Sequence, residues 1–258
     1  MKLGFEESQT AFDSGSQQAR VWTERWVATQ MFCTNCGSPT LSQLPANSPV
    51  ADFICPTCSE QYEVKSKKGA TFGKSVADGA YGTKIERLSS STNPHLLLLN
   101  YDVAQREVRN VFVVPKHFFV PEIIQRRPPL KDTARRAGWV GSNILIGQVP
   151  EAGRIFILRN GIEEPRDAVL AKWKQTLFLK RESVEARGWV IEVMKAVEMI
   201  GRLEFDLDDV YAFEARLSAI YPGNNNVRPK IRQQLQVLRD NGYLEFLGRG
   251  RYRLRTQV

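Results

Sequence analysis

Hydrophobic and polar residues alternate strictly in one short stretch of the N-terminal half, Tyr62-Glu63-Val64-Lys65. Successive side chains of a β-strand point to opposite faces of a sheet, so this alternation predicts a strand with Glu63 and Lys65 on one face. Tyr62 and Val64 are then expected on the other. Two side chains capable of chemistry would thus point in the same direction.

The C-terminal quarter has the periodicity of helices. Ser183 can cap a helix, and the apolar face expected to follow consists of Trp189, Val190, Val193, Val197 and Ile200. Further helices are predicted over residues 207–220 and 227–240. Apolar residues of the last one recur at helical spacing: Val227, Ile231, Leu235 and Leu238. An alternating segment around Gly248-Arg249-Gly250 predicts a hairpin with a basic tip. Three helices and such a hairpin are typical of a winged helix-turn-helix.

The charge of the chain favours a polyanionic partner. It carries 36 basic and 28 acidic residues, a net charge of +8. Residues 223–258 hold eight Lys or Arg and two acidic residues, a balance of +6, whereas residues 183–222 hold four and eight, a balance of −4. This reversal predicts a binding face and a back. An ordinary solvated surface is the alternative.

Four cysteines occur in two C-x2-C pairs, Cys33 with Cys36 and Cys55 with Cys58, and eighteen residues separate the pairs. This spacing is typical of a four-cysteine zinc site. Four thiolates leave no open position on the metal, so the predicted role of Zn2+ is structural. Two disulfides or two redox pairs are the alternatives, and the beginning of the chain, which has no apolar stretch of signal-peptide type, argues against disulfides.

Asp52 lies eleven residues before Glu63, and Lys65 follows two residues later. If the segments around Asp52 and Glu63 pair as a hairpin, the second cysteine pair lies at its tip and the two carboxylates come together. Carboxylates are ligands that Mg2+ prefers, and a lysine beside them can position water or stabilise charge on a phosphate. The predicted catalytic residues are therefore Asp52, Glu63 and Lys65, with Asp52 and Glu63 holding Mg2+. Surface salt bridges would also explain the triplet.

Two weaker predictions concern the flanking helices. Glu24 lies on an amphipathic helix suggested by Trp22, Trp26 and Val27; it is either another metal contact or simply exposed. On the predicted helix 227–240, glutamine can pair with adenine in the major groove and arginine can meet phosphates. The candidate DNA contacts of the C-terminal domain are Arg228, Lys230, Arg232, Gln233, Gln236, Arg249 and Arg251. A winged helix used only for protein contact is the alternative.

The chain resembles methyl-directed restriction endonucleases of the DpnI type over almost its full length. The resemblance is carried by the stretches Pro49-Val-Ala-Asp-Phe, Lys65-Ser-Lys-Lys-Gly, Asp78-Gly-Ala-Tyr, Thr133-Ala-Arg-Arg-Ala-Gly-Trp139, Gly153-Arg-Ile-Phe and Lys230-Ile-Arg-Gln-Gln-Leu-Gln-Val-Leu-Arg-Asp240.

That resemblance implies an α/β (α+β) fold, with a PD-(D/E)XK nuclease domain over residues 1–182 that contains the zinc knuckle. A winged-helix DNA-binding domain over residues 183–258 would follow. The implied activity is Mg2+-dependent cleavage of duplex DNA at GATC sites with N6-methyladenine, leaving blunt ends. By the same resemblance, Asp52, Glu63 and Lys65 fall on catalytic positions and the four cysteines on zinc ligands, and both domains read the methylated sequence.

Trp139, preceded by Arg135, Arg136 and Gly138, is the aromatic residue expected nearest to DNA in the nuclease domain. A buried core tryptophan is the alternative.

The longest apolar run, Leu96 to Leu99, is far too short to span a bilayer. A cytoplasmic protein is therefore expected. No obligate protein partner is predicted. The rival functions are a non-catalytic zinc and winged-helix regulator, and a repair nuclease of the same fold that acts on another modified base.

The free energy of burying one methyl group limits how well methylated DNA can be distinguished from unmethylated DNA. Burying one methyl group contributes roughly 0.8 kcal/mol, only about fourfold in affinity. Four methyl contacts, two per reading domain, would give about 3 kcal/mol, or on the order of a hundredfold. We therefore expect slower cleavage of hemimethylated than of fully methylated duplexes, measured as single-turnover rates. Equal rates would contradict discrimination by repeated methyl contacts.

Overall fold

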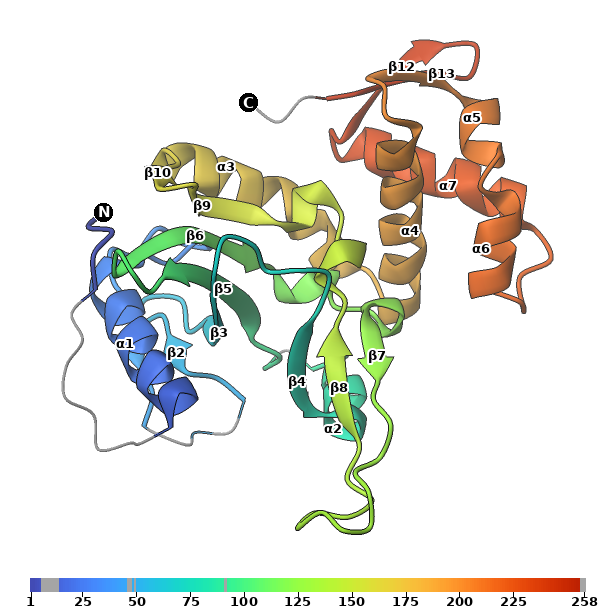
Figure 1. Ribbon diagram of the computed structural model, residues 1–258. Helices are drawn as coiled ribbons and strands as arrows, with labels where there is room; N and C mark the ends of the chain where they lie inside the picture. The colour runs from blue at the N-terminus through green and yellow to red at the C-terminus, as the bar shows by residue number, and fades with distance from the viewer. Residues whose placement is uncertain (6–13, 46–47, 49, 91, 256–258) are drawn as a thin grey trace.

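A mixed seven-stranded sheet forms the centre of the N-terminal part of the fold (Figure 1). The computed structural model describes residues 1–5, 14–45, 48, 50–90 and 92–255. The strand order is β1-β2-β3-β5-β6-β9-β10; β3 and β5 run parallel, and the other neighbouring pairs run antiparallel. The strands are β1 (Ser42–Gln43), β2 (Phe53–Ile54), β3 (Gln61–Lys68), β5 (His95–Asp102), β6 (Glu107–Val114), β9 (Ile155–Arg159) and β10 (Ile162–Glu163).

The central strand β5 is buried on both faces. Its apolar residues run together instead of alternating, as expected for a strand covered on both sides. Leu97 and Leu99 share a buried cluster with helices α1 (Gly15–Gln30) and α3 (Arg166–Thr176). Leu96 and Leu98 pack on the opposite side, in a cluster that includes α4 (Val184–Ile200).

The predicted pairing of the Asp52 and Glu63 segments is confirmed. Strands β2 and β3 are antiparallel, with Phe53 opposite Tyr62, and the backbone N–H of Asp52 donates to the carbonyl of Tyr62 at 2.9 Å. Cys55 and Cys58 lie in the connection between the two strands. The expected alternation is also confirmed, because Tyr62 and Val64 pack into the cluster on the α1 face.

A second, three-stranded sheet of order β4-β8-β7 stands beside the first. Its strands are β4 (Val76–Ala80), β7 (Ile124–Arg126) and β8 (Gly141–Ile144), and helix α2 (Tyr81–Arg87) follows β4 directly. The connection between β7 and β8, residues 127–140, extends away from the rest of the fold as a long loop (Figure 1).

The C-terminal part has the predicted winged-helix elements. Helix α4 is capped as expected by Ser183, whose Oγ accepts from the N–H of Ala186 at 3.2 Å. Helix α7 spans the predicted range, Val227–Asp240, and strand β11 (Glu204–Asp206) extends the hairpin of β12 (Leu244–Gly248) and β13 (Arg251–Leu254) to a small sheet of three strands.

The single helix predicted over 207–220 is wrong. Two short helices occupy it, α5 (Leu207–Tyr211) and α6 (Glu214–Ile220). Phe213 leaves helical geometry with φ −91° and ψ 5°, and its ring packs against the core. Val210 and Leu217 are buried on either side of the break, so each short helix still buries an apolar side chain in the core.

Helix α4 joins the two parts of the chain through one hydrophobic core. Trp189 and Met194 of α4 belong to the same buried cluster as Leu98 of the large sheet and Leu235 of α7. In addition, Arg187 donates to the carbonyl of Leu88 at 3.0 Å. The winged helix is thus docked on the sheet. No helix within the described ranges is long and apolar enough to cross a membrane.

Gly153 provides a test of this packing. A Cβ at this position would lie 2.7 Å from Val149 and 2.8 Å from the buried ring of Phe118. We expect Gly153→Ala to lower the free energy of unfolding by about 1–3 kcal/mol, because the ring has no room to retreat. Urea denaturation measures it. Gly15→Ala is the control, since nothing lies within 4 Å of its Cβ; equal stability of both variants would contradict the expectation.

Candidate active site and zinc centre

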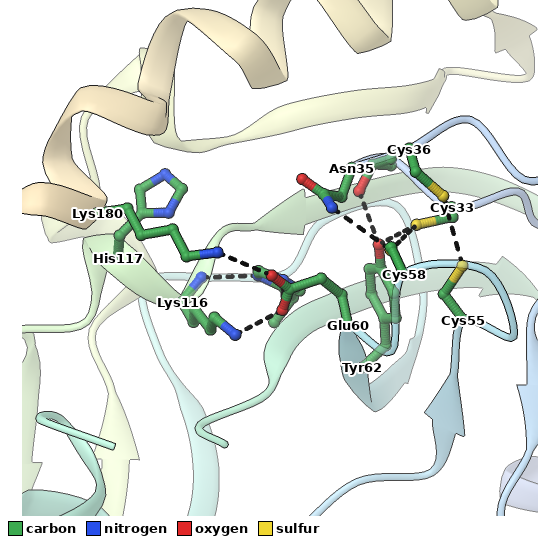
Figure 2. Close-up of polar contacts among 12 residues, drawn as sticks. Cys33, Asn35, Cys36, Cys55, Cys58, Glu60, Tyr62, Lys116, His117 and Lys180 are labelled. Atoms are coloured by element: carbon green, nitrogen blue, oxygen red, sulfur yellow. Dashed lines mark hydrogen bonds and ion pairs between the residues drawn. The ribbon is translucent and has the colours of Figure 1, made fainter. Parts of the chain in front are cut away.

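The four cysteines come together as predicted. Figure 2 shows their sulfur atoms beside one another, and all four lie within 4.8 Å of each other. Cys33 Sγ is 3.6 Å from Cys58 Sγ, and Cys36 Sγ is 3.6 Å from Cys55 Sγ. Tetrahedral bonds of about 2.3 Å to Zn2+ place sulfurs about 3.8 Å apart. The cluster therefore fits a zinc ion.

Side chains around the cluster orient its ligands. Asn35 donates from Nδ2 to Cys58 Sγ at 3.4 Å and accepts from the indole N–H of Trp173 at 2.9 Å. The hydroxyl of Tyr62 lies 3.2 Å from Cys33 Sγ. Burial opposes ionisation of Cys55, but backbone N–H groups of the knuckle outweigh it and lower the pKa of this thiol to about 7. A lowered pKa favours the thiolate that binds metal. Burial raises the pKa of Cys33 and Cys36, and the charge of a bound cation would offset that effect.

Glu60 links the zinc knuckle to distant parts of the chain (Figure 2). One of its oxygens pairs with Lys116 at 2.5 Å and accepts from His95 at 3.0 Å; the other pairs with Lys180 at 3.1 Å. Burial disfavours the carboxylate, but these neighbours hold the pKa of Glu60 well below its usual range. Since Lys180 lies just before α4, Glu60 connects the knuckle to the start of the winged-helix part.

Asp52 lies immediately before β2, and its carboxylate is held from two sides. Oδ2 accepts from the backbone N–H of Val64 at 2.8 Å, and Oδ1 pairs with Arg20 of α1 at 2.8 Å. Arg20 also pairs with Glu24 at 2.5 Å, and the other oxygen of Glu24 accepts from Gln43 at 2.9 Å. The Glu24 side chain is only 13% exposed. The alternative of a merely exposed Glu24 is therefore wrong, although no contact to a metal follows from this.

Glu63 and Lys65 meet two residues that the sequence reasoning missed, Asp78 of β4 and Lys84 of α2. Lys65 Nζ lies 2.7 Å from Glu63 Oε1 and 3.2 Å from Asp78 Oδ1. Lys84 Nζ lies 2.7 Å from Asp78 Oδ2 and 3.4 Å from Glu63 Oε2. Each carboxylate uses both oxygens, and each ammonium group bridges both acids. We call this arrangement the four-charge ring; it lines a pocket of about 250 Å³.

The electrostatics of the four-charge ring define what Lys65 can do. Burial raises the pKa of Glu63, against the opposing charge of Lys84. For Lys65, burial favours the neutral amine, but Glu63 and Asp78 outweigh it and raise the pKa. For Asp78, burial is likewise outweighed by Lys84 and Lys65, which lower the pKa. Lys65 is therefore an ammonium group at neutral pH, suited to stabilising negative charge and not to removing a proton.

The predicted catalytic residues Asp52, Glu63 and Lys65 lie on one hairpin, but they belong to two separate networks of ion pairs. Glu63 and Lys65 line the pocket, whereas Asp52 reaches β3 through the neighbouring N–H of Val64. A local sequence signal for Asp78 and Lys84 is lacking, because they arrive from the second sheet and its helix. Asp78 did lie in one of the stretches that carry the family resemblance.

On α7 the predicted division into faces is confirmed. Val227, Ile231, Leu235 and Leu238 are buried, while Gln233 and Gln236 are exposed and Lys230 is half-buried. Gln234 also lies on the buried face. Helix α7 thus presents amide side chains outward.

Several C-terminal arginines already form ion pairs or hydrogen bonds with side chains of the same part of the chain. Arg228 pairs with Glu214 of α6 at 2.8 Å, and Arg232 donates to a tyrosine hydroxyl of α5. Arg251 lies 3.3 Å from Glu204 of β11. The basic and acidic segments therefore partly neutralise one another, and the division into a binding face and a back stays a prediction. Arg249, at the exposed turn of the hairpin, has no ion pair among the described residues.

Arg135, Arg136 and Trp139 lie on the long loop between β7 and β8. Both arginines are exposed, and the Arg136 guanidinium stacks over the Trp139 ring at 4.8 Å. Trp139 is half-buried and lies so close to Gly141 that a Cβ there would be 2.7 Å from the indole. The tryptophan is thus neither a core residue nor fully exposed, and it remains at the surface.

These features define the class of protein: a PD-(D/E)XK restriction-endonuclease-like domain with a four-cysteine zinc knuckle, followed by a winged helix-turn-helix. A family model described as DpnI, Dam-replacing family, matches residues 1–182, and one described as DpnI_C, Dam-replacing HTH domain, matches residues 185–254. The chain belongs to the DpnI, or Dam-replacing, family. It is accordingly a methyl-dependent, restriction-type nuclease that binds DNA.

The zinc centre generates a prediction about the hairpin. Removing Zn2+ with a chelator should increase amide hydrogen exchange over residues 52–62, because the cysteine cluster closes the tip of the β2–β3 hairpin. Residues 227–240 of the winged helix should be unaffected. Metal analysis and hydrogen-exchange mass spectrometry measure both effects.

Cys36→Ser, which removes one ligand, should reproduce the effect without chelator. Unchanged exchange in the hairpin after complete loss of zinc would contradict a structural role.

Proposed function

We propose that the protein hydrolyses duplex DNA at GATC sites carrying N6-methyladenine, leaves blunt ends, and requires Mg2+. The observation that carries the catalytic part is the β2–β3 hairpin, on which Asp52 is bonded to the strand that presents Glu63 and Lys65 to a pocket. The sequence preference and the form of the ends rest on the family resemblance.

The charges around the hairpin suit a divalent cation. Four carboxylates, those of Glu24, Asp52, Glu63 and Asp78, take part in ion pairs with the three cations Arg20, Lys65 and Lys84, a net charge of −1. Arg87, which also lines the pocket, brings the balance to zero, so these groups alone do not attract a phosphate diester. One divalent ion changes the balance to +2, which attracts the substrate, and carboxylate oxygens are the donors that Mg2+ prefers.

In this proposal Asp52 and Glu63 hold the ion and Lys65 acts on the substrate. When bound, Mg2+ supplies Lewis acidity and positive charge beside the scissile phosphate. The Val64 N–H keeps the Asp52 carboxylate facing β3. The Lys65 side chain is 29% exposed at the pocket. Its ammonium group orients the attacking water and stabilises the charge that develops on the phosphate.

DNA reading is assigned to two surfaces. Gln233 and Gln236 of α7 are placed in the major groove, where glutamine can pair with adenine. Phosphate contacts are assigned to Arg228, Lys230, Arg232, Arg249 and Arg251. The loop with Arg135, Arg136 and Trp139 supplies the contact of the nuclease domain. We assign residues 1–182 to the nuclease domain and residues 183–258 to the DNA-binding domain.

Plasmids from adenine-methylating and non-methylating hosts test the proposal. We expect Mg2+-dependent linear products from the methylated plasmid alone, with blunt ends mapped at GATC by sequencing. Cleavage of both plasmids would contradict methyl dependence and favour a repair nuclease. Asp52→Ala should abolish cleavage while the melting temperature and DNA affinity stay near those of the wild type.

The matched control is Asp167→Ala, which removes an exposed carboxylate of α3 and should leave cleavage unchanged. If wild-type protein binds methylated DNA but never cuts it with Mg2+, the non-catalytic regulator is the better account.

A further inference from the structure

Two residues of the four-charge ring, Asp78 and Lys84, neither hold the proposed Mg2+ nor act on the substrate. They are the most buried members of the ring: their side chains are 4% and 9% exposed, against 15% for Glu63 and 29% for Lys65. Lys65 therefore lies toward the mouth of the pocket, and the Asp78–Lys84 pair lies at its base.

The contacts in the ring show how the buried pair acts on Lys65. A lysine side chain has four rotatable bonds, and one contact to Glu63 from the same strand would leave its ammonium group free to swing. Asp78 supplies a second acceptor at 3.2 Å from a different sheet. Two acceptors on separate elements restrict the ammonium group to the space between them.

Lys84 completes the arrangement from the opposite side. It lies within ion-pair distance of the remaining oxygens of Asp78 and Glu63, and its ammonium group stands 5.3 Å from the ring centre of the buried Phe119. Without Lys84, the four-charge ring would keep two carboxylates and one ammonium group, and Glu63 and Asp78 would repel each other across Lys65. Lys84 thereby keeps both acids close enough to share Lys65.

A purely structural role explains this pair poorly. Charges at the base of a pocket lose their hydration, and apolar side chains of similar size fill such a space at least as favourably. Asp78 and Lys84 are costly to bury, and they contact Lys65 and Glu63 directly. Their presence is better explained by the positions that they impose on these two groups.

We propose that Asp78 and Lys84 are positioning residues of the catalytic centre, which hold the Lys65 ammonium and the Glu63 carboxylate in their working orientation. The proposal rests on the proposed nuclease function. It extends the catalytic constellation from one hairpin to a second sheet and its helix.

The test compares Lys84→Met and Asp78→Asn with the wild type in single-turnover cleavage of methylated duplex. We expect each variant to reduce the rate constant about a hundredfold, as displacement of a reacting group by roughly 1 Å does. DNA affinity should change less than about twofold, because α7 is untouched. Lys84→Arg, which keeps the charge, should recover part of the rate.

The double variant Lys84→Met/Asp78→Asn should be no slower than the slower single variant, because the two residues act as one unit. Multiplying losses would contradict a shared role. The matched control is Glu192→Gln, which breaks a buried ion pair of α4, Glu192 with Lys195 at 2.5 Å. It should lower the melting temperature without lowering the rate constant of the folded enzyme.

A second readout needs neither metal nor DNA. In the wild type, the 15N-resolved ammonium signal of Lys65, assigned by its loss in Lys65→Met, should be protected from solvent exchange. Asp78→Asn and Lys84→Met should remove that protection. Variants that cleave at the wild-type rate and keep the signal would overturn the positioning role, whereas a wild type that never cleaves would overturn the proposed function itself.

Discussion

The antiparallel pairing of β2 with β3 is the constraint on which the rest of the site depends. Phe53 opposite Tyr62 determines the register. A slip of one residue would turn Glu63 and Lys65 toward the apolar cluster on the α1 face, because side chains alternate along a strand. The four-cysteine cluster closes the tip of this hairpin. The Tyr62 hydroxyl lies beside Cys33 of that cluster, and the Tyr62 ring packs into the hydrophobic core. Zinc binding at the hairpin tip, the register of β2 with β3 and the direction of the Glu63 side chain therefore depend on one another.

Charge around the hairpin is compensated locally, in two separate networks. Asp52 shares Arg20 with Glu24, while Glu63 shares Lys65 and Lys84 with Asp78. The first network is anchored on α1 and the second on β4 and α2. Because each network draws on an element distant in sequence, the catalytic carboxylates proposed here are held by the tertiary fold and not by the hairpin alone.

Contacts of α4 and of Glu60 join the N-terminal part of the chain to the winged-helix part. Helix α4 belongs to the winged helix by its sequence pattern, yet its side chains complete the core beneath the large sheet. Glu60, next to the zinc knuckle, reaches Lys180 just before that helix. The strand β8, which pairs with the strand of Asp78, also ends the long loop that carries Trp139. The zinc knuckle, the pocket and both candidate DNA-contacting surfaces are therefore linked by short contacts.

The sequence by itself determined the features that depend on local spacing. These are the four-cysteine cluster, the alternation that directs Glu63 and Lys65 to one face, the Ser183 cap, and the bounds and buried face of α7, since each follows from the periodicity of a helix, a strand or a metal-binding turn. Only the tertiary structure decided the rest. Asp78 and Lys84 reach the pocket from a second sheet and its helix, the helix predicted over 207–220 breaks at Phe213, and Glu204 partly compensates the charge of Arg251. Such contacts join residues far apart in the chain, and no local pattern encodes which of them will meet.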